Sequence, residues 1–438
     1  MVKGIVLSVL AVGVIIIFIT KFVKKFNLTK KYITTLFKKV FPKITFNDES
    51  IIIESFEPQQ MKTENHIDDK YYYQINAKDE SGKQYLFEGC IYDPSADYAE
   101  EQFEAERKKS RPKDETMNSS GAGLATSTHS AGIEMAQGML RDQAKLEKEG
   151  RVIEARTKKF AIDVEITKKI NEYSNIVPKI HFFDEKKNFV LTEFCGVTLL
   201  KDVLVNIAET EKLNLIKTIT IQLAHAHNAF KNISLLVPSR RAMQAEDFRK
   251  MLRSGLKQLV KAKLLSEAQI NDLLNEYYNT AVWLGDNFER NIRFKSLTPY
   301  EMFVNDNNPI IRNWNDYDTS SDMTNLIDLL KDPIVDLSIE QEEEFVKLYR
   351  QTRFGDTNYE QVIKQYHLNS CHILTVQLCY MILYIKSKLQ SNVDTDVLVN
   401  WDQEHFNKLF NNALNTWSTY EESRDYAAKL KEVFDSIV

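Results

Sequence analysis

The sequence predicts an α+β protein that is rich in strands in its first half, helical in its second half, and preceded by an N-terminal transmembrane helix. Strand-like apolar runs concentrate in the first half of the chain, helical periodicity dominates the second half, and the chain opens on an uncharged apolar run. At 438 residues, 43% of them apolar, it can bury large cores. The predicted divisions are an anchor at 1–22, a basic segment at 23–46, a strand-containing part at 47–193 with an insertion at 94–160, a helical part at 194–400 and a helical extension at 401–438.

The apolar run from Gly4 to Thr20 is long enough to span a bilayer if flanking side chains reach the interface. A cleaved signal peptide is the alternative. Such peptides carry basic charge before the apolar core, whereas here Lys3 alone precedes it and the other lysines follow. We therefore expect an uncleaved single-pass anchor, with the body on the lysine-rich side of the membrane.

The segment 21–43 holds eight lysines and no acid, with Ile33, Leu36, Phe37 and Val40 at helical spacing. This pattern predicts a basic amphipathic helix against the lipid surface. An anchor followed by such a helix is similar to mitochondrial membrane proteins. We expect the inner membrane with the body in the matrix; the outer mitochondrial membrane or the endoplasmic reticulum, with the body facing the cytosol, are alternatives.

The net charge bears on the partners of the protein, and the cysteines bear on its compartment. Removing the nine lysines of the first 46 residues from the formal net charge of −5 leaves −14 on the rest, which argues against nucleic acid as a partner. The four cysteines show no CxxC spacing and lie in apolar segments, as buried thiols of a reducing compartment do. His225 and His227 lie in one helical run, where packing is favoured over metal ligation. We expect no metal and no cofactor.

Three strands are predicted at the start of the strand-containing part, at 50–56, 71–79 and 84–92, with a glycine-containing turn between the last two. A long helix follows from Glu134 to Tyr173. The segment between the first two strands, 57–70, contains no glycine. A loop that cradles phosphates needs glycine so that backbone amides can approach them.

The stretch from Phe294 to Asp318 predicts a loop, a strand at 302–304, an Asn/Pro turn and a second strand at 310–311. Its frame resembles the aminoglycoside phosphotransferase and choline kinase family, whose members carry HGDLHPGNILV followed by VIDWE. The resemblance extends to the strand pair that ends at 189–193, where Glu193 and Phe194 match the hinge between lobes, and to the DPIVDL motif. The apolar positions that match the site motifs are Leu297, Pro299, Met302, Phe303, Val304, Ile311 and Trp314.

This resemblance implies a bilobal protein-kinase-like fold but not the family's chemistry. Ser296 stands at the position of the catalytic Asp, Glu301 at that of the metal-binding Asn, and Asn313 at that of the metal-binding Asp. Phosphoryl transfer needs a base, metal ligands and cations on the phosphates, so a degenerate member, a pseudokinase, is expected.

The small lobe departs from the family as well. Glu88 falls where the third strand should supply a lysine, and Asp163 or Glu165 falls where the helix carboxylate should pair with it, which would turn an attraction into a repulsion. The residues 189–191 and Phe194 could line an adenine pocket or form a core strand. Both interpretations are kept open.

Segments outside the family frame, at 94–135, 236–290 and 401–438, are expected to contact other protein subunits. Gly121 and Gly123 belong to a polar loop without the context of a phosphate-binding loop. The sequence thus predicts an inactive kinase-like scaffold at a membrane. The alternatives are an atypical phosphotransferase that uses Glu301, Asp316 or Asp318, and a nucleotide-binding sensor without turnover.

Overall fold

A computed structural model describes most of the chain in segments. They are 28–56, 70–95, 130–231, 243–287, 291–295, 297–305, 308–311, 317–321, 323–355, 358–390 and 398–437. The predicted anchor at 4–20, most of the insertion at 94–135 and the site positions Ser296, Asn313 and Asp316 lie outside the described residues.

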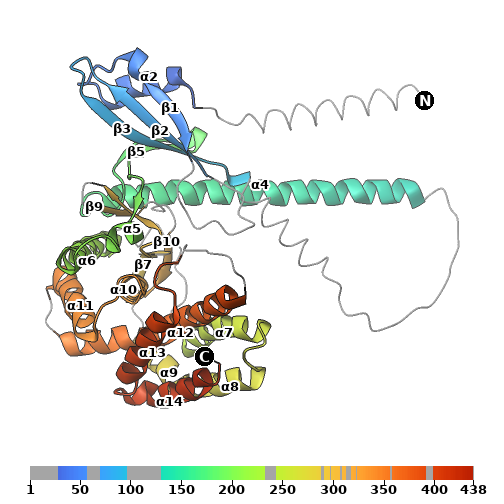
Figure 1. The fold of residues 1–438 in the computed structure, drawn as a ribbon. Coiled ribbons are helices and arrows are strands. Elements are labelled where there is room, and N and C mark those ends of the chain that lie inside the picture. Colours follow the sequence, from blue (N-terminus) through green and yellow to red (C-terminus); the bar gives the residue numbers. More distant parts are fainter. Residues whose placement is uncertain are drawn as a thin grey trace.

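The small lobe is built on a five-stranded antiparallel sheet in the order β1-β2-β3-β5-β4 (Figure 1). The three strands predicted at its start are confirmed. The turn between β2 and β3 contains Gly82, whose φ of 86° favours glycine. The five strands are β1 (Ile52–Phe56), β2 (Lys70–Lys78), β3 (Gln84–Tyr92), β4 (Ile180–Asp184) and β5 (Phe189–Glu193).

One face of this sheet is covered by α2 (Lys30–Val40), which Thr29 caps. Ile33, Leu36 and Phe37 are buried in one cluster with sheet residues such as Phe87. The amphipathic helix is therefore confirmed, but its apolar face lies on the sheet and is closed to lipid. Contact between its lysines and a membrane stays a prediction.

The other face of the sheet meets α4 (Ser130–Ile170), the predicted long helix, which passes between the lobes in Figure 1. Tyr92 of β3 stacks on Phe160 of α4, with ring centroids 4.8 Å apart. Successive strand residues point to opposite faces, so even-numbered residues of β3 and β5 face α4 and odd-numbered ones face α2. This parity decides which face of the sheet Glu88 occupies.

The large lobe begins with a helical core that also receives the inner face of α4. Two small sheets, β6-β8-β9 and β7-β10, lie against this core. The helices are α5 (Leu200–Leu204), α6 (Glu209–Lys231), α10 (Met323–Leu330) and α11 (Ile339–Phe354), and the strands are β6 (Thr198–Leu199), β7 (Asn291–Phe294), β8 (Met302–Asn305), β9 (Asn308–Ile311) and β10 (Tyr317–Ser320).

A second helical core unites the predicted insertion at 236–290 with the C-terminal extension. The apolar stripe of the extension is covered by this lobe: Phe406, Phe410, Leu414 and Trp417 are all buried. These segments therefore pack chiefly on each other, and the lobe itself explains their apolar faces. The helices are α7 (Ala245–Lys261), α8 (Glu267–Glu276), α9 (Tyr278–Asp286), α12 (Tyr359–Gln390), α13 (Gln403–Trp417) and α14 (Glu421–Asp435).

One helix within the described segments, at Tyr359–Lys388, is long and apolar enough to cross a membrane. It belongs to α12, and 61% of its most apolar window is buried inside the protein. Its side chains supply the centre of the second helical core. The apolar character of α12 is therefore explained by packing.

Candidate functional site

The segment predicted as the site forms the expected hairpin. β8 pairs antiparallel with β9, with Met302 opposite Ile311 and Phe303 opposite Ile310. Leu297, Met302, Phe303 and Ile311 are all buried, so the apolar frame of the motif serves as core. β7, which leads into the loop, pairs with β10 beyond the hairpin. The fold thus brings the two ends of the predicted site to neighbouring strands.

Of the three site positions Ser296, Glu301 and Asn313, the described residues include Glu301 alone. Its backbone N–H donates to the Thr298 carbonyl at 3.0 Å in the turn before β8. Burial raises the pKa of Asp328 to about 7; the charge of Arg293 opposes this rise and that of Glu301 adds to it. Glu301 therefore lies near an acidic group of α10. Across the described parts of the chain, no group of three or more His, Cys, Asp or Glu side chains could hold a metal ion.

The structure buries both Glu88 and Asp163. Glu88 lies opposite Thr192 of β5, on the face of the sheet that α4 covers, and is 1% exposed. Asp163 is 4% exposed and accepts a 2.7 Å hydrogen bond from Lys159 on its own helix. Glu165 points outward and pairs with Lys168, so Asp163 is the inward helix carboxylate of the two predicted. A buried carboxylate thus occupies the strand position where the resemblance implies a lysine.

The predicted hinge residues make hydrogen bonds with other residues of the chain. The Glu193 carboxylate accepts the Lys179 N–H at 3.1 Å, and its own N–H donates to the Lys179 carbonyl at 3.0 Å. Asn305 donates its side-chain amide to the Phe194 carbonyl at 3.1 Å. Gly196 has a φ of 95°, and a Cβ there would lie 3.1 Å from the Val304 carbonyl oxygen.

The two interpretations of the hinge strand are now separable. Phe189, Val190 and Leu191 are fully buried in the hydrophobic clusters, so they form a core strand. Phe194 is partly exposed and remains a candidate for lining a pocket.

A series of buried, hydrogen-bonded side chains holds the backbone of Phe294, just before the loop. Asn325 of α10 accepts the Phe294 N–H at 3.1 Å and donates to the Phe294 carbonyl at 2.9 Å. Its Oδ1 also lies 3.3 Å from Nε2 of His227, whose Nδ1 lies 2.6 Å from the Tyr349 hydroxyl. Arg353 in turn donates to that hydroxyl at 2.7 Å.

These contacts fix the direction of each hydrogen bond. Because Oδ1 of Asn325 can only accept, Nε2 of His227 carries the proton and Nδ1 accepts from Tyr349. Burial is the main cause that lowers the pKa of His227, and the charge of Arg353 adds to it, so the ring is neutral. His227 therefore has the packing role that the sequence predicted, with a hydrogen bond on each nitrogen.

Sequence reasoning missed Asn325, Tyr349, Arg353 and Arg293, which position this loop. Arg293 donates to the carbonyls of Phe294 and Lys295 at 3.1 and 2.8 Å. The sequence does contain one signal. Asn325 interrupts the apolar run of α10, and a buried amide requires partners.

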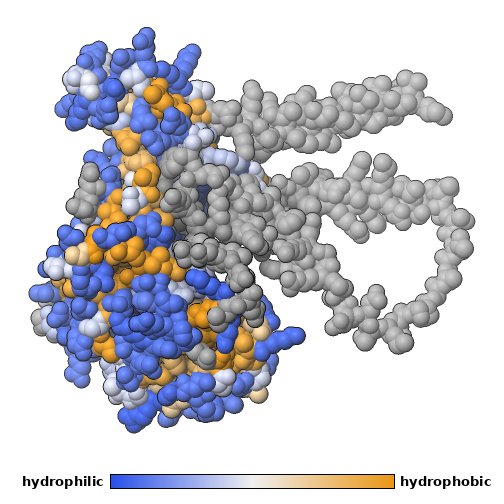
Figure 2. Space-filling model, viewed as in Figure 1, coloured by the Kyte–Doolittle hydropathy of each residue, from blue (hydrophilic) through white to orange (hydrophobic). Residues whose placement is uncertain are grey.

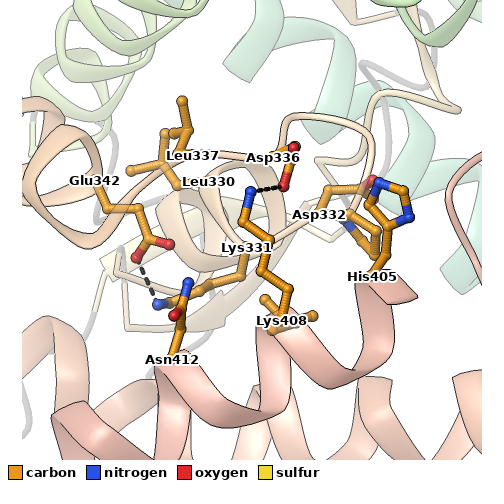
Figure 3. A pocket seen from close by; sticks show the side chains of 11 residues that line it. Leu330, Lys331, Asp332, Asp336, Leu337, Glu342, His405, Lys408 and Asn412 are labelled. Carbon is orange, nitrogen blue, oxygen red and sulfur yellow. Dashed lines mark hydrogen bonds and ion pairs between the residues drawn. The ribbon is translucent and has the colours of Figure 1, made fainter. Parts of the chain in front are cut away.

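The DPIVDL motif joins α10 to the C-terminal extension. Asp332 accepts the Ile334 N–H at 3.1 Å, which closes the turn. Asp336 has a φ of 49° and accepts a hydrogen bond from Lys408 of α13 at 2.6 Å. A dashed line joins these two groups in Figure 3, where both line a small pocket.

At the base of this pocket, Lys331 and Glu342 form a buried ion pair with a nitrogen–oxygen distance of 2.5 Å (Figure 3). Their side chains are 1% and 3% exposed. The cavity measures about 20 Å³, enough for about one water molecule. The cavity is therefore too small for a ligand, and we interpret it as a gap where α10, α11 and α13 pack together.

Comparison of the sequence with protein-family models gives no match, and comparison with curated proteins gives none either. Solved structures give matches at low identity. The GDP complex of an aminoglycoside 2′-phosphotransferase-IIIa is 12% identical, covers 89% of this chain and 100% of its own, and has a TM-score of 0.39. A choline/ethanolamine kinase family protein from Mesorhizobium loti is 10% identical, covers 62% and 83%, and has a TM-score of 0.39. A choline kinase from Streptococcus pneumoniae is 11% identical, covers 88% and 99%, and has a TM-score of 0.35.

Proposed function

We propose that this chain is a catalytically inactive kinase-like protein, anchored in a membrane through residues 4–20, that serves as a structural subunit of a membrane protein assembly. We place it at the mitochondrial inner membrane, because an anchor followed by a basic amphipathic helix is similar to mitochondrial membrane proteins, and we place its body in the matrix, because the lysines that follow the anchor favour that orientation. Its proposed partners are the lipid bilayer and other protein subunits.

One observation carries the proposal of inactivity: Glu88 is buried on the face of the sheet that meets α4. A kinase places a lysine at that strand position because the phosphates of its nucleotide need a cation there. A carboxylate at the same place repels phosphate. The Ser296 and Asn313 substitutions in the sequence act in the same direction, because they replace a base and a metal ligand.

The test is a thermal-shift titration of the detergent-solubilised full chain with ATP and magnesium, combined with an assay for ATP turnover. A scaffold should show neither a shift in melting temperature nor ATP turnover. A nucleotide that binds, at about 100 times its Kd, would instead stabilise the fold by about 2.7 kcal/mol. A shift without turnover indicates a sensor. Turnover that depends on magnesium and is lost in Asn313→Ala would overturn the proposal in favour of an atypical phosphotransferase using Glu301, Asp316 or Asp318.

The anchor has its own test. We expect carbonate washing to leave the full chain in the membrane and protease added to sealed mitoplasts to spare its body. Carbonate extraction of the chain would refute the span. Cleavage of the body from outside, or N-glycans on it, would refute the orientation.

A further inference from the structure

We infer that the outer face of α2, made by Lys31, Thr35, Lys38 and Lys39, is a docking surface for an anionic bilayer, and that it turns the small lobe toward the membrane. The inference rests on the proposed function for one point, the anchor that precedes α2. The contact it describes is electrostatic, because the apolar face of the same helix is already buried on the sheet.

α2 is held rigidly, so its outer face has a fixed orientation. Phe37 lies 5.1 Å from Phe87 between ring centroids, and Tyr32 donates to Asp184 at 2.9 Å. The four residues of the outer face are all exposed. Figure 2 shows this end of the small lobe as mostly hydrophilic.

The charges of α2 suit one end of the helix and not the other: Lys38 and Lys39 stand in its last turn, where the helix dipole favours positive charge. Lys30 and Lys31 stand in its first turn without an acid there, where the helix dipole disfavours positive charge. Lys38 lies 3.8 Å from Asp48, but both side chains are more than half exposed, so this pair contributes little. An external anion would offset the unfavourable position of Lys31 and would add to the effect of the helix dipole at Lys38 and Lys39.

Two features favour lipid over an acidic protein as that anion. Lysine is depleted at protein–protein interfaces, and all nine basic residues of the first 46 are lysines. The nine residues between the predicted span and Lys30 reach at most about 30 Å when fully extended, so α2 stays close to the headgroups. Lysines near an anionic surface contribute about 1 kcal/mol each, which corresponds to about a fivefold change in accessibility.

The experiment measures acetylation of individual lysines in the full chain, reconstituted into phosphatidylcholine vesicles with and without phosphatidylserine. Phosphatidylserine should slow the labelling of Lys31 and Lys38 about fivefold, and about 1 M salt should remove the protection because it shortens the screening length to about 3 Å. The exposed Lys250 and Lys257 of α7 should label alike in both vesicles.

Matched variants complete the test. Lys31→Gln with Lys38→Gln should abolish the protection of Lys39, whereas Lys250→Gln with Lys257→Gln should keep it. Equal labelling of Lys31 in both vesicles would overturn the inference, as would protection seen only in native membranes, which would indicate an acidic protein. ATP turnover or carbonate extraction would count against the proposed function and leave the labelling result unaffected.

Discussion

The hydrogen bonds of Asn325 provide a sharp test of how the loop before Ser296 is held. Asn325 is fully buried, and its amide serves three groups: the N–H and the carbonyl of Phe294, and Nε2 of His227. Leucine has nearly the same shape, so Asn325→Leu removes the hydrogen bonds and leaves little cavity. Each buried group left without a partner costs about 1–3 kcal/mol, so we expect a loss of at least about 3 kcal/mol in the free energy of unfolding.

Asn369 offers a matched control. It is also a buried helical asparagine, 3% exposed, and its side chain donates to the Gln365 carbonyl at 2.9 Å. That carbonyl lies in the middle of α12 and keeps its helical hydrogen bond in Asn369→Leu. The control should therefore lose about 1 kcal/mol or less.

The assay is urea unfolding of the detergent-solubilised full chain, followed by circular dichroism, with hydrogen exchange of the peptide 291–295. In Asn325→Leu this peptide should exchange faster than in the wild type, and in Asn369→Leu it should not. If the two variants are equally stable, or if exchange at 291–295 is unchanged in Asn325→Leu, the amide does not hold the loop and the reasoning is refuted.

Three further predictions follow from buried charge and backbone geometry. Lys331→Met should cost about 3–5 kcal/mol in urea unfolding because it leaves Glu342 buried without its partner, and adding Glu342→Leu should recover most of the loss; a double variant as unstable as the single one would contradict this. Burial raises the pKa of Asp332 to about 7, so between about pH 4 and 7 the folded state binds more protons than the unfolded state, and stability falls as the pH rises. Asp332→Asn should therefore be more stable than the wild type at about pH 8 but not at about pH 4, and an equal effect at both pH values would refute the pKa shift. Gly196→Ala should lower the melting temperature more than Gly82→Ala, because both have positive φ but only Gly196 adds a 3.1 Å approach to the Val304 carbonyl; equal losses would show that this approach is harmless.

Local pattern was sufficient to predict most elements of the fold. Strands 50–56, 71–79 and 84–92, the long helix ending near Tyr173 and the hairpin at 302–311 all appear where their periodicity placed them. Such signals are local because strand alternation and helical spacing depend on neighbours in the sequence. The residues on which the proposal of inactivity depends in the sequence, Ser296 and Asn313, could also be named from the sequence alone, because the argument concerns their identity and not their contacts.

Tertiary structure decided what each apolar face and each charge contacts. The stripe of α2 suits a membrane or a sheet equally well by composition, and only the position of β3 and β5 shows that the sheet covers it. Likewise, strand parity places Glu88 opposite α4, and the chain from Arg353 to Asn325 joins residues far apart in sequence. Burial and hydrogen-bond partners are properties of pairs of distant segments, so periodicity can predict that a face is buried but not which surface buries it.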